Sequence, residues 1–142
     1  MAGPESTERQ GPRHEARERA LSLLYESEIK GSPLEEVLEA LPVPPDPYAE
    51  RLARGVVRHL ARIDELLGAS AEGWEIARMP AVDRSVLRLA VYELLEEPSV
   101  PVAVTIDEAV RLVSDYSTDD SGRFVNGVLS TVAARARPGG AP

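Results

Sequence analysis

The most informative absence in the sequence is cysteine. Because none is present, disulfides and thiolate metal sites are excluded, as is usual for proteins of a reducing cytoplasm. The two histidines lie far apart and neither has a partner at metal-binding spacing, so we expect no metal site and no cofactor. No apolar run approaches the roughly twenty residues that cross a bilayer, and the first residues lack the apolar stretch of a signal peptide. The sequence therefore predicts a soluble, cytoplasmic protein.

Lysine is nearly absent as well, since only Lys30 among the 16 cationic residues is a lysine. The others are arginines, whose planar guanidinium matches phosphates and stacks on bases. The net charge of −8 argues against a polyanionic partner, but the cations are unevenly distributed. Residues 9–19 hold four arginines and His14 against two glutamates, and residues 121–142 hold arginines and no carboxylate. Two locally basic segments in an acidic chain are compatible with a local contact to nucleic acid.

Hydrophobic periodicity predicts an all-α fold of about six or seven helices, because no segment alternates with period two for long enough to form a strand. A chain of 142 residues suits one compact domain. We expect a disordered leader over residues 1–11, a helical domain over residues 12–137 and a short tail over residues 138–142. The predicted helices cover residues 13–30, 33–41, 47–67 and 82–95, then a helix that begins at Ser99 or Thr105 and ends near residue 116, and a last one over residues 120–137. Trp74 is expected to plug the core from a connecting turn.

The helix over residues 82–95 is expected to lie at the centre of the fold, because apolar side chains cover more than half of its circumference. Glu93 falls inside this apolar arc, so its carboxylate needs a donor such as an arginine or a helix N-terminus. A structural acid is favoured over a catalytic one, because no second carboxylate or histidine is placed to work with it.

The sequence also predicts helix caps, namely capping boxes at Ser32–Glu35 and Thr105–Glu108 and N-caps at Asp46 and at Asp119 or Asp120.

No constellation of residues supports catalysis. The chain has no glycine-rich phosphate loop, no carboxylate pair with a cleft and no nucleophile beside a base, so we predict that it is not an enzyme. Arginines on one helix face and an aromatic ring at a helix start favour single-stranded RNA, which needs cations for phosphates and rings for unstacked bases. The residues concerned are Arg13 and Arg17 on the first helix, with Arg9 where that helix extends so far, and Arg123 and Phe124 at the start of the last.

Each of these features also has a second interpretation. The arginine stripe can be a solvated face that is paired with neighbouring glutamates. Phe124 can belong to the apolar stripe of the last helix and be part of the core. Gly127 weakens that helix, which packing explains only where another backbone approaches it closely.

Four segments of the chain resemble the NusB family of bacterial transcription antitermination factors, over about residues 13–134. They are Ala16–Ala20 continuing to Leu24–Tyr25, Trp74–Arg78, Asp83–Leu94 and Phe124–Leu129, of which the last two are the most specific. The resemblance implies two small helical subdomains. It also implies a factor of ribosomal RNA operons that binds single-stranded boxA RNA with the ribosomal protein NusE, within the antitermination complex of RNA polymerase. Either a monomer or a homodimer is compatible with it.

The resemblance assigns residues to two surfaces. Arg13, His14 and Arg17 correspond to the phosphate-contacting face of the first helix, while Tyr25, Asp120 and Phe124, with the adjoining Arg123, correspond to positions near the RNA. Asp83 and Arg88 correspond to positions near NusE. We expect the arginines of the first helix to be exposed, and Asp83 to face a cation supplied by the partner.

Two other classes of protein were considered. The same helical domain precedes ribosomal RNA cytosine methyltransferases, but this chain lacks a catalytic cysteine and a methyl-donor-binding sheet. The remaining alternative is a helical protein–protein adaptor without an RNA role. A steep fall of boxA binding with added salt would distinguish an RNA-binding factor from such an adaptor.

Overall fold

The computed structural model describes residues 12–139, which form seven α-helices and one short 3-10 helix without a strand. The predicted all-α class and number of helices are therefore confirmed. The expected leader over residues 1–11, including Arg9, lies outside the described residues, as do residues 140–142 of the tail. No helix within residues 12–139 combines the length and apolar character of a membrane span. The helices are α2 (Pro12–Lys30), α3 (Leu34–Glu39), α4 (Pro47–Arg58), α5 (Leu60–Ser70), η1 (Ile76–Arg78), α6 (Ala81–Glu96), α7 (Val102–Tyr116) and α8 (Asp119–Ala136).

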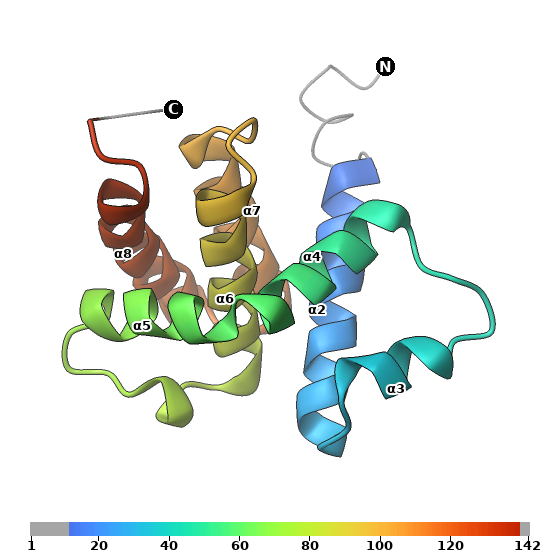
Figure 1. The fold of residues 1–142 in the computed structure, drawn as a ribbon. Coiled ribbons are helices and arrows are strands. Elements are labelled where there is room, and N and C mark those ends of the chain that lie inside the picture. The colour runs from blue at the N-terminus through green and yellow to red at the C-terminus, as the bar shows by residue number, and fades with distance from the viewer. Residues whose placement is uncertain (1–11, 140–142) are drawn as a thin grey trace, which may run out of the picture.

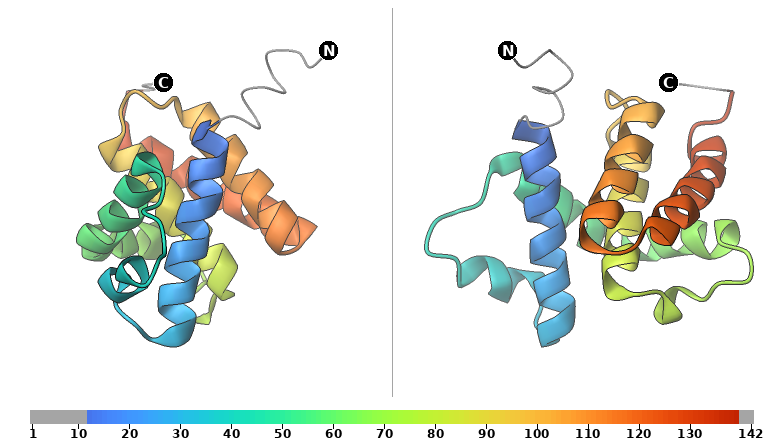
Figure 2. Two further views of the ribbon diagram at one scale, coloured as in Figure 1. Left: turned by 90° about the vertical axis from the view of Figure 1, so that its right-hand side faces the viewer. Right: turned by 180° about the vertical axis from the view of Figure 1, so that it is seen from behind.

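Helix α6 lies at the centre of the fold, as its apolar circumference predicts. It packs against α2, α4, α5, α7 and α8. Figure 1 shows α2 and α3 on one side of it, α8 on the other and α7 behind it, and the rear view in Figure 2 shows α7 and α8 together, apart from α2, α3 and α4. These are the two small helical subdomains, and one continuous apolar cluster joins them through α6. Its largest fully buried side chains include Leu23, Leu52, Ile63, Leu67, Leu87, Leu94 and Leu129.

The predicted helix over residues 47–67 is divided in two. The break falls at His59, where φ is −105° and ψ is 19°, and α5 then continues to Ser70. Because α4 packs against α2 and α6 while α5 packs against α6 and α8, the bend lets one apolar stripe cover both subdomains. Near the bend, α4 approaches α6 so closely that a Cβ at Gly55 would overlap the ring of Tyr92.

The predicted helix caps are only partly correct. The side chain of Asp46 caps α4, since its Oδ1 accepts from the Tyr48 N–H at 2.8 Å. The predicted capping boxes do not form: no side chain caps α3, and α7 begins at Val102, so Thr105 lies inside that helix. Pro101 before α7 already has the φ of a helix start, which explains why α7 begins at Val102 and not at Thr105. Thr118, rather than either aspartate after it, caps α8.

The C-terminal end of α8 closes the opposite end of α6. Arg137, which follows the last turn of α8, donates from Nε to the Leu94 carbonyl at 3.0 Å and from Nη1 to the Val100 carbonyl at 2.7 Å. Its Nη2 donates to the carbonyls of Glu93 and Glu97 at 3.2 and 3.0 Å. One guanidinium therefore donates to four carbonyls at the end of α6 and in the connection to α7. Two of them, those of Glu93 and Glu97, also accept a backbone N–H, from Glu97 and Val100 respectively.

Candidate nucleic-acid interface

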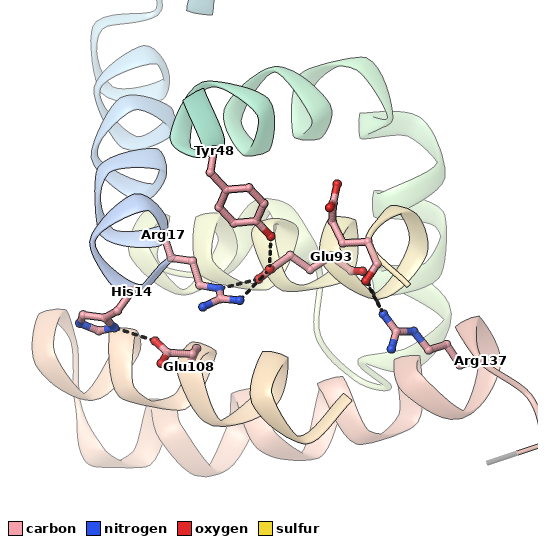
Figure 3. A network of polar contacts seen from close by, with 7 residues as sticks. His14, Arg17, Tyr48, Glu93, Glu108 and Arg137 are labelled. Atoms are coloured by element: carbon pink, nitrogen blue, oxygen red, sulfur yellow. Dashed lines mark hydrogen bonds and ion pairs between the residues drawn. The ribbon is translucent and has the colours of Figure 1, made fainter. Parts of the chain in front are cut away.

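Arg17 does not lie on an exposed arginine stripe; that prediction is wrong. Its side chain is buried, with 5% of the residue exposed, and it meets Glu93, which is 2% exposed. Nε donates to Glu93 Oε1 and Nη2 to Oε2, both at 2.9 Å, and the Tyr48 hydroxyl donates to Oε2 at 2.8 Å (Figure 3). The expectation that an arginine compensates Glu93 is confirmed. The reason for the error is that α4, α6 and α7 all cover this side of α2.

The surroundings of Arg17 and Tyr48 shift the pKa values of both side chains in the direction that favours their hydrogen bonds to Glu93. Burial on its own would lower the pKa of the Arg17 guanidinium, but hydrogen bonding and attraction from Glu93 hold it above its usual value. Burial, followed by the nearby Glu93 carboxylate, raises the pKa of the Tyr48 hydroxyl. Arg17 therefore stays charged and Tyr48 stays neutral, which suits a guanidinium and a hydroxyl donating to one carboxylate.

His14 is also buried rather than exposed. Its Nδ1 lies 2.6 Å from Glu108 Oε2 on α7 (Figure 3). Its Nε2 lies 3.4 Å from Glu18 Oε1, one turn along α2. An imidazole between two carboxylates joins α2 to α7 and is not available to a phosphate. The predicted role of His14 as a cation on the surface is thus not supported by its position.

Arg13 is exposed, as expected, but it is not isolated. Its guanidinium carbon lies 4.2 Å from the centroid of the Tyr48 ring, over the ring face. Such a cation–π contact uses the face of the guanidinium and leaves the N–H groups at its edge able to donate. The first turn of α2 therefore presents one ordered cation to the surface.

Tyr25 lies farther along α2 and has 39% of its surface exposed. It is on the same helix face as Glu18, which accepts from the Tyr116 hydroxyl at 2.7 Å, and close to Glu28, which pairs with Arg84. These contacts place the end of α7 and the start of α6 beside the middle and the C-terminal half of α2. From Arg13 to Tyr25 the rise of the helix is about 18 Å, so these two candidate RNA residues lie far apart along α2.

At the start of α8, Phe124 is neither fully in the core nor fully exposed. Its ring is partly buried against the core and lies 5.0 Å from the Trp74 ring, at an interplanar angle of 56°. Trp74 is 57% exposed, so its predicted role as a core plug is wrong. Arg123 and Asp120 are exposed and pair with each other. Open space surrounds the Cβ position of Gly127, so packing does not explain that glycine.

Asp83 and Arg88, the expected protein-contact residues, both have partners within the chain. Asp83 is only 3% exposed, contrary to expectation, and its Oδ2 accepts from the Ser121 hydroxyl at 2.8 Å. Arg88 donates to both carboxylate oxygens of Asp64 at 2.9 Å, and this pair is partly exposed. Of the two residues, only Arg88 therefore presents a charged group near the surface.

Within residues 12–139 no three His, Cys, Asp or Glu residues gather as a metal site would need.

Sequence reasoning did not identify Tyr48, Glu108 or Tyr116 as parts of this region. Tyr48 belonged to the apolar stripe of its helix, and Glu108 to a predicted capping box. The sequence did contain one indication of such residues: Glu93 is predicted to be buried and needs hydrogen-bond donors, which a neighbouring helix has to supply. Which helix would supply them depends on tertiary packing.

The structure of residues 12–139 defines a class of protein: a small, all-helical fold with exposed arginine and aromatic side chains on one helix and at the start of another. The NusB family model matches residues 14–134, and the chain belongs to that family. It is 52% identical over 129 residues to the transcription antitermination protein NusB of Saccharopolyspora erythraea, a match that covers 87% of each chain.

Two solved structures are similar as well. The NusB of T. maritima superposes with a TM-score of 0.80 at 38% identity, over 90% of this chain and 94% of that one. A NusB chain from a crystal structure of antitermination factors NusB and NusE in complex with dsRNA gives a TM-score of 0.74 at 32% identity, over 87% of this chain and 96% of that one.

Proposed function

We propose that the protein is a transcription antitermination factor of ribosomal RNA operons that binds single-stranded boxA RNA together with NusE. It would do so in the cytoplasm, as part of the antitermination complex of RNA polymerase, and by binding rather than by catalysis. The observation that carries the proposal is the similarity, over most of both chains, to a chain of a crystal structure of NusB and NusE in complex with dsRNA. The exposed cation and aromatic side chains described above supply the chemistry that RNA recognition requires.

The RNA surface that we propose runs along α2 to the start of α8. Arg13 and Arg123 would contact phosphates, and Tyr25 and Phe124 would contact bases. Asp120 would orient Arg123 through their ion pair. The buried pairs of His14 and Arg17 would contribute indirectly, by fixing α2 on α7 and α6.

This surface carries few cations, so we expect the protein alone to bind RNA weakly. The exposed face of α2 alternates Arg19 with Glu15 and Glu26, and the chain as a whole is acidic. If Arg13 and Arg123 each neutralise one phosphate, log K should fall with log salt with a slope of about −1.4 for single-stranded RNA. Most of the affinity should therefore appear only when NusE supplies further contacts.

The test is a titration of labelled boxA RNA with the protein, with NusE and with both. Matched probes are a scrambled strand of the same composition and the boxA duplex. We expect tight, salt-dependent binding of the single strand only with both proteins present. Equal binding of the scrambled strand would refute boxA recognition. Binding of NusE without any RNA affinity, even at low salt, would favour the adaptor.

The contact with NusE is tested separately, by calorimetry on variants of α6. Arg88→Ala should weaken NusE binding while the protein stays folded, since its pair with Asp64 is partly exposed. Asp83→Ala should instead lower thermal stability, because it removes the buried hydrogen bond from Ser121 that joins α8 to α6. A melting temperature of Asp83→Ala equal to that of the parent, with NusE binding lost, would return Asp83 to a direct contact. Unchanged NusE affinity of Arg88→Ala would exclude Arg88.

A further inference from the structure

Tyr48 connects the buried core of the molecule to an exposed cation. Its hydroxyl points inward and donates to Glu93 at 2.8 Å, while its ring lies under the guanidinium of Arg13. Figure 3 shows the ring extending from α4 toward the junction between α2 and α6. The hydroxyl makes the buried contact and the ring face makes the contact with Arg13. The hydrogen bond to Glu93 therefore anchors the ring from its buried end.

The position of Tyr48 is itself fixed by a stronger interaction. Glu93 receives two charge-assisted hydrogen bonds from Arg17, and these three residues come from α4, α6 and α2. Asp46 also caps α4 immediately before Tyr48 and sets the direction of its first turn. The ring under Arg13 is therefore attached to the rigid part of the fold, although Arg13 itself lies in the first turn of α2.

An arginine at a helix start gains most from such support. A free arginine side chain loses rotamer entropy when it is ordered on a phosphate, and a guanidinium already held on a ring has lost part of it beforehand. The stacked arrangement also keeps the edge N–H groups available, because the ring occupies only the face. A support of this kind adds affinity without adding charge.

We propose that Tyr48 is a positioning residue for RNA binding, which holds the Arg13 guanidinium ready for a phosphate of the bound strand. This inference rests on the function proposed above. Tyr48 itself would not contact the RNA, and it adds no charge to the surface. Its effect should pass entirely through Arg13.

The experiment is a double-mutant cycle on the affinity for boxA RNA in the presence of NusE, with a thermal melt of every variant. Tyr48→Leu removes the ring and should weaken binding about two- to fivefold, the size of an exposed cation–π contact. Tyr48→Phe keeps the ring but loses the hydrogen bond to Glu93 that anchors it, so it should weaken binding less than Tyr48→Leu does. In an Arg13→Ala background, Tyr48→Leu should cause no further loss.

A second ring-deleting variant keeps the test decisive if Tyr48→Leu does not fold. Tyr48→Gln lacks the ring but retains an N–H donor for Glu93, and it should weaken binding as much as the leucine variant is expected to. Equal losses in the Arg13 and Arg13→Ala backgrounds, or a loss in Tyr48→Phe as large as in the ring-deleting variants, would overturn the inference and leave boxA binding intact. Failure of the parent itself to bind boxA would instead refute the proposed function.

Discussion

The buried ion pair between Arg17 and Glu93 predicts an asymmetric response to mutation. Replacing Arg17 by methionine leaves the Glu93 carboxylate in a site that is 2% exposed, with the Tyr48 hydroxyl as its remaining donor shown in Figure 3. A buried charge without its partner costs far more than the pair contributes, because the desolvation penalty is no longer offset. Arg17→Met/Glu93→Met removes both charges and keeps apolar side chains of similar length.

The expected magnitudes follow from this difference. Arg17→Met should lower the free energy of unfolding by about 3–5 kcal/mol, and the double variant should recover most of that loss. With an unfolding entropy of about 2.1 cal/mol/K per residue over the whole chain, the single variant should melt about 10–17 °C below the parent. Arg19→Met is the matched control, because Arg19 is exposed on the same helix and should change stability by about 0.5 kcal/mol or less.

The assay is urea denaturation followed by far-UV circular dichroism, with thermal melts on the same preparations. A melting temperature of Arg17→Met close to that of Arg19→Met would refute the argument, since it would mean that Arg17 is solvated and free to contact RNA. A double variant no more stable than the single one would show that the pair contributes through its geometry, and not only by neutralising a buried charge.

Two further predictions concern close packing. Gly55→Ala should destabilise the fold by about 1–3 kcal/mol because its methyl group overlaps the Tyr92 ring, whereas Gly127→Ala, also within a helix but facing open space, should stabilise it by about 0.5–1 kcal/mol. Denaturation curves of the two variants decide this, and a shift of the same sign in both would contradict it. Phe124→Ala should cost less than the roughly 3–5 kcal/mol of a fully buried phenylalanine, weaken boxA binding by about 1–3 kcal/mol and change the emission of Trp74, the sole tryptophan. A normal boxA affinity of its folded fraction would place Phe124 in the core alone.

The sequence was sufficient for the features that depend on local pattern. The helices, the central position of α6 and the need of Glu93 for a donor all follow from which residues repeat at helical spacing. The break at His59 could not be predicted in this way, because the apolar stripe continues through it and only the packing of α5 on α8 requires the bend.

The candidate site was predicted less well than the fold, for a related reason. Arg13 and Arg17 are four residues apart on one helix face, so the sequence treats them alike. In the structure Arg13 lies at the end of the helix, beyond the reach of the core, and Arg17 lies one turn inside it. His14 and Asp83 were misplaced in the same way, because each meets a polar partner on a distant segment and is buried with it.

The four carbonyls bound by Arg137 have a consequence for local opening of the molecule. The end of α6 and the end of α8 would ordinarily fray independently, each in its own time, because terminal turns are the least stable parts of helices. Here one guanidinium is shared by both ends. Fraying of the last turn of α8 would withdraw it from the carbonyls of α6 and of the following connection, so we expect the two ends to open together and their amide protons to exchange at similar rates.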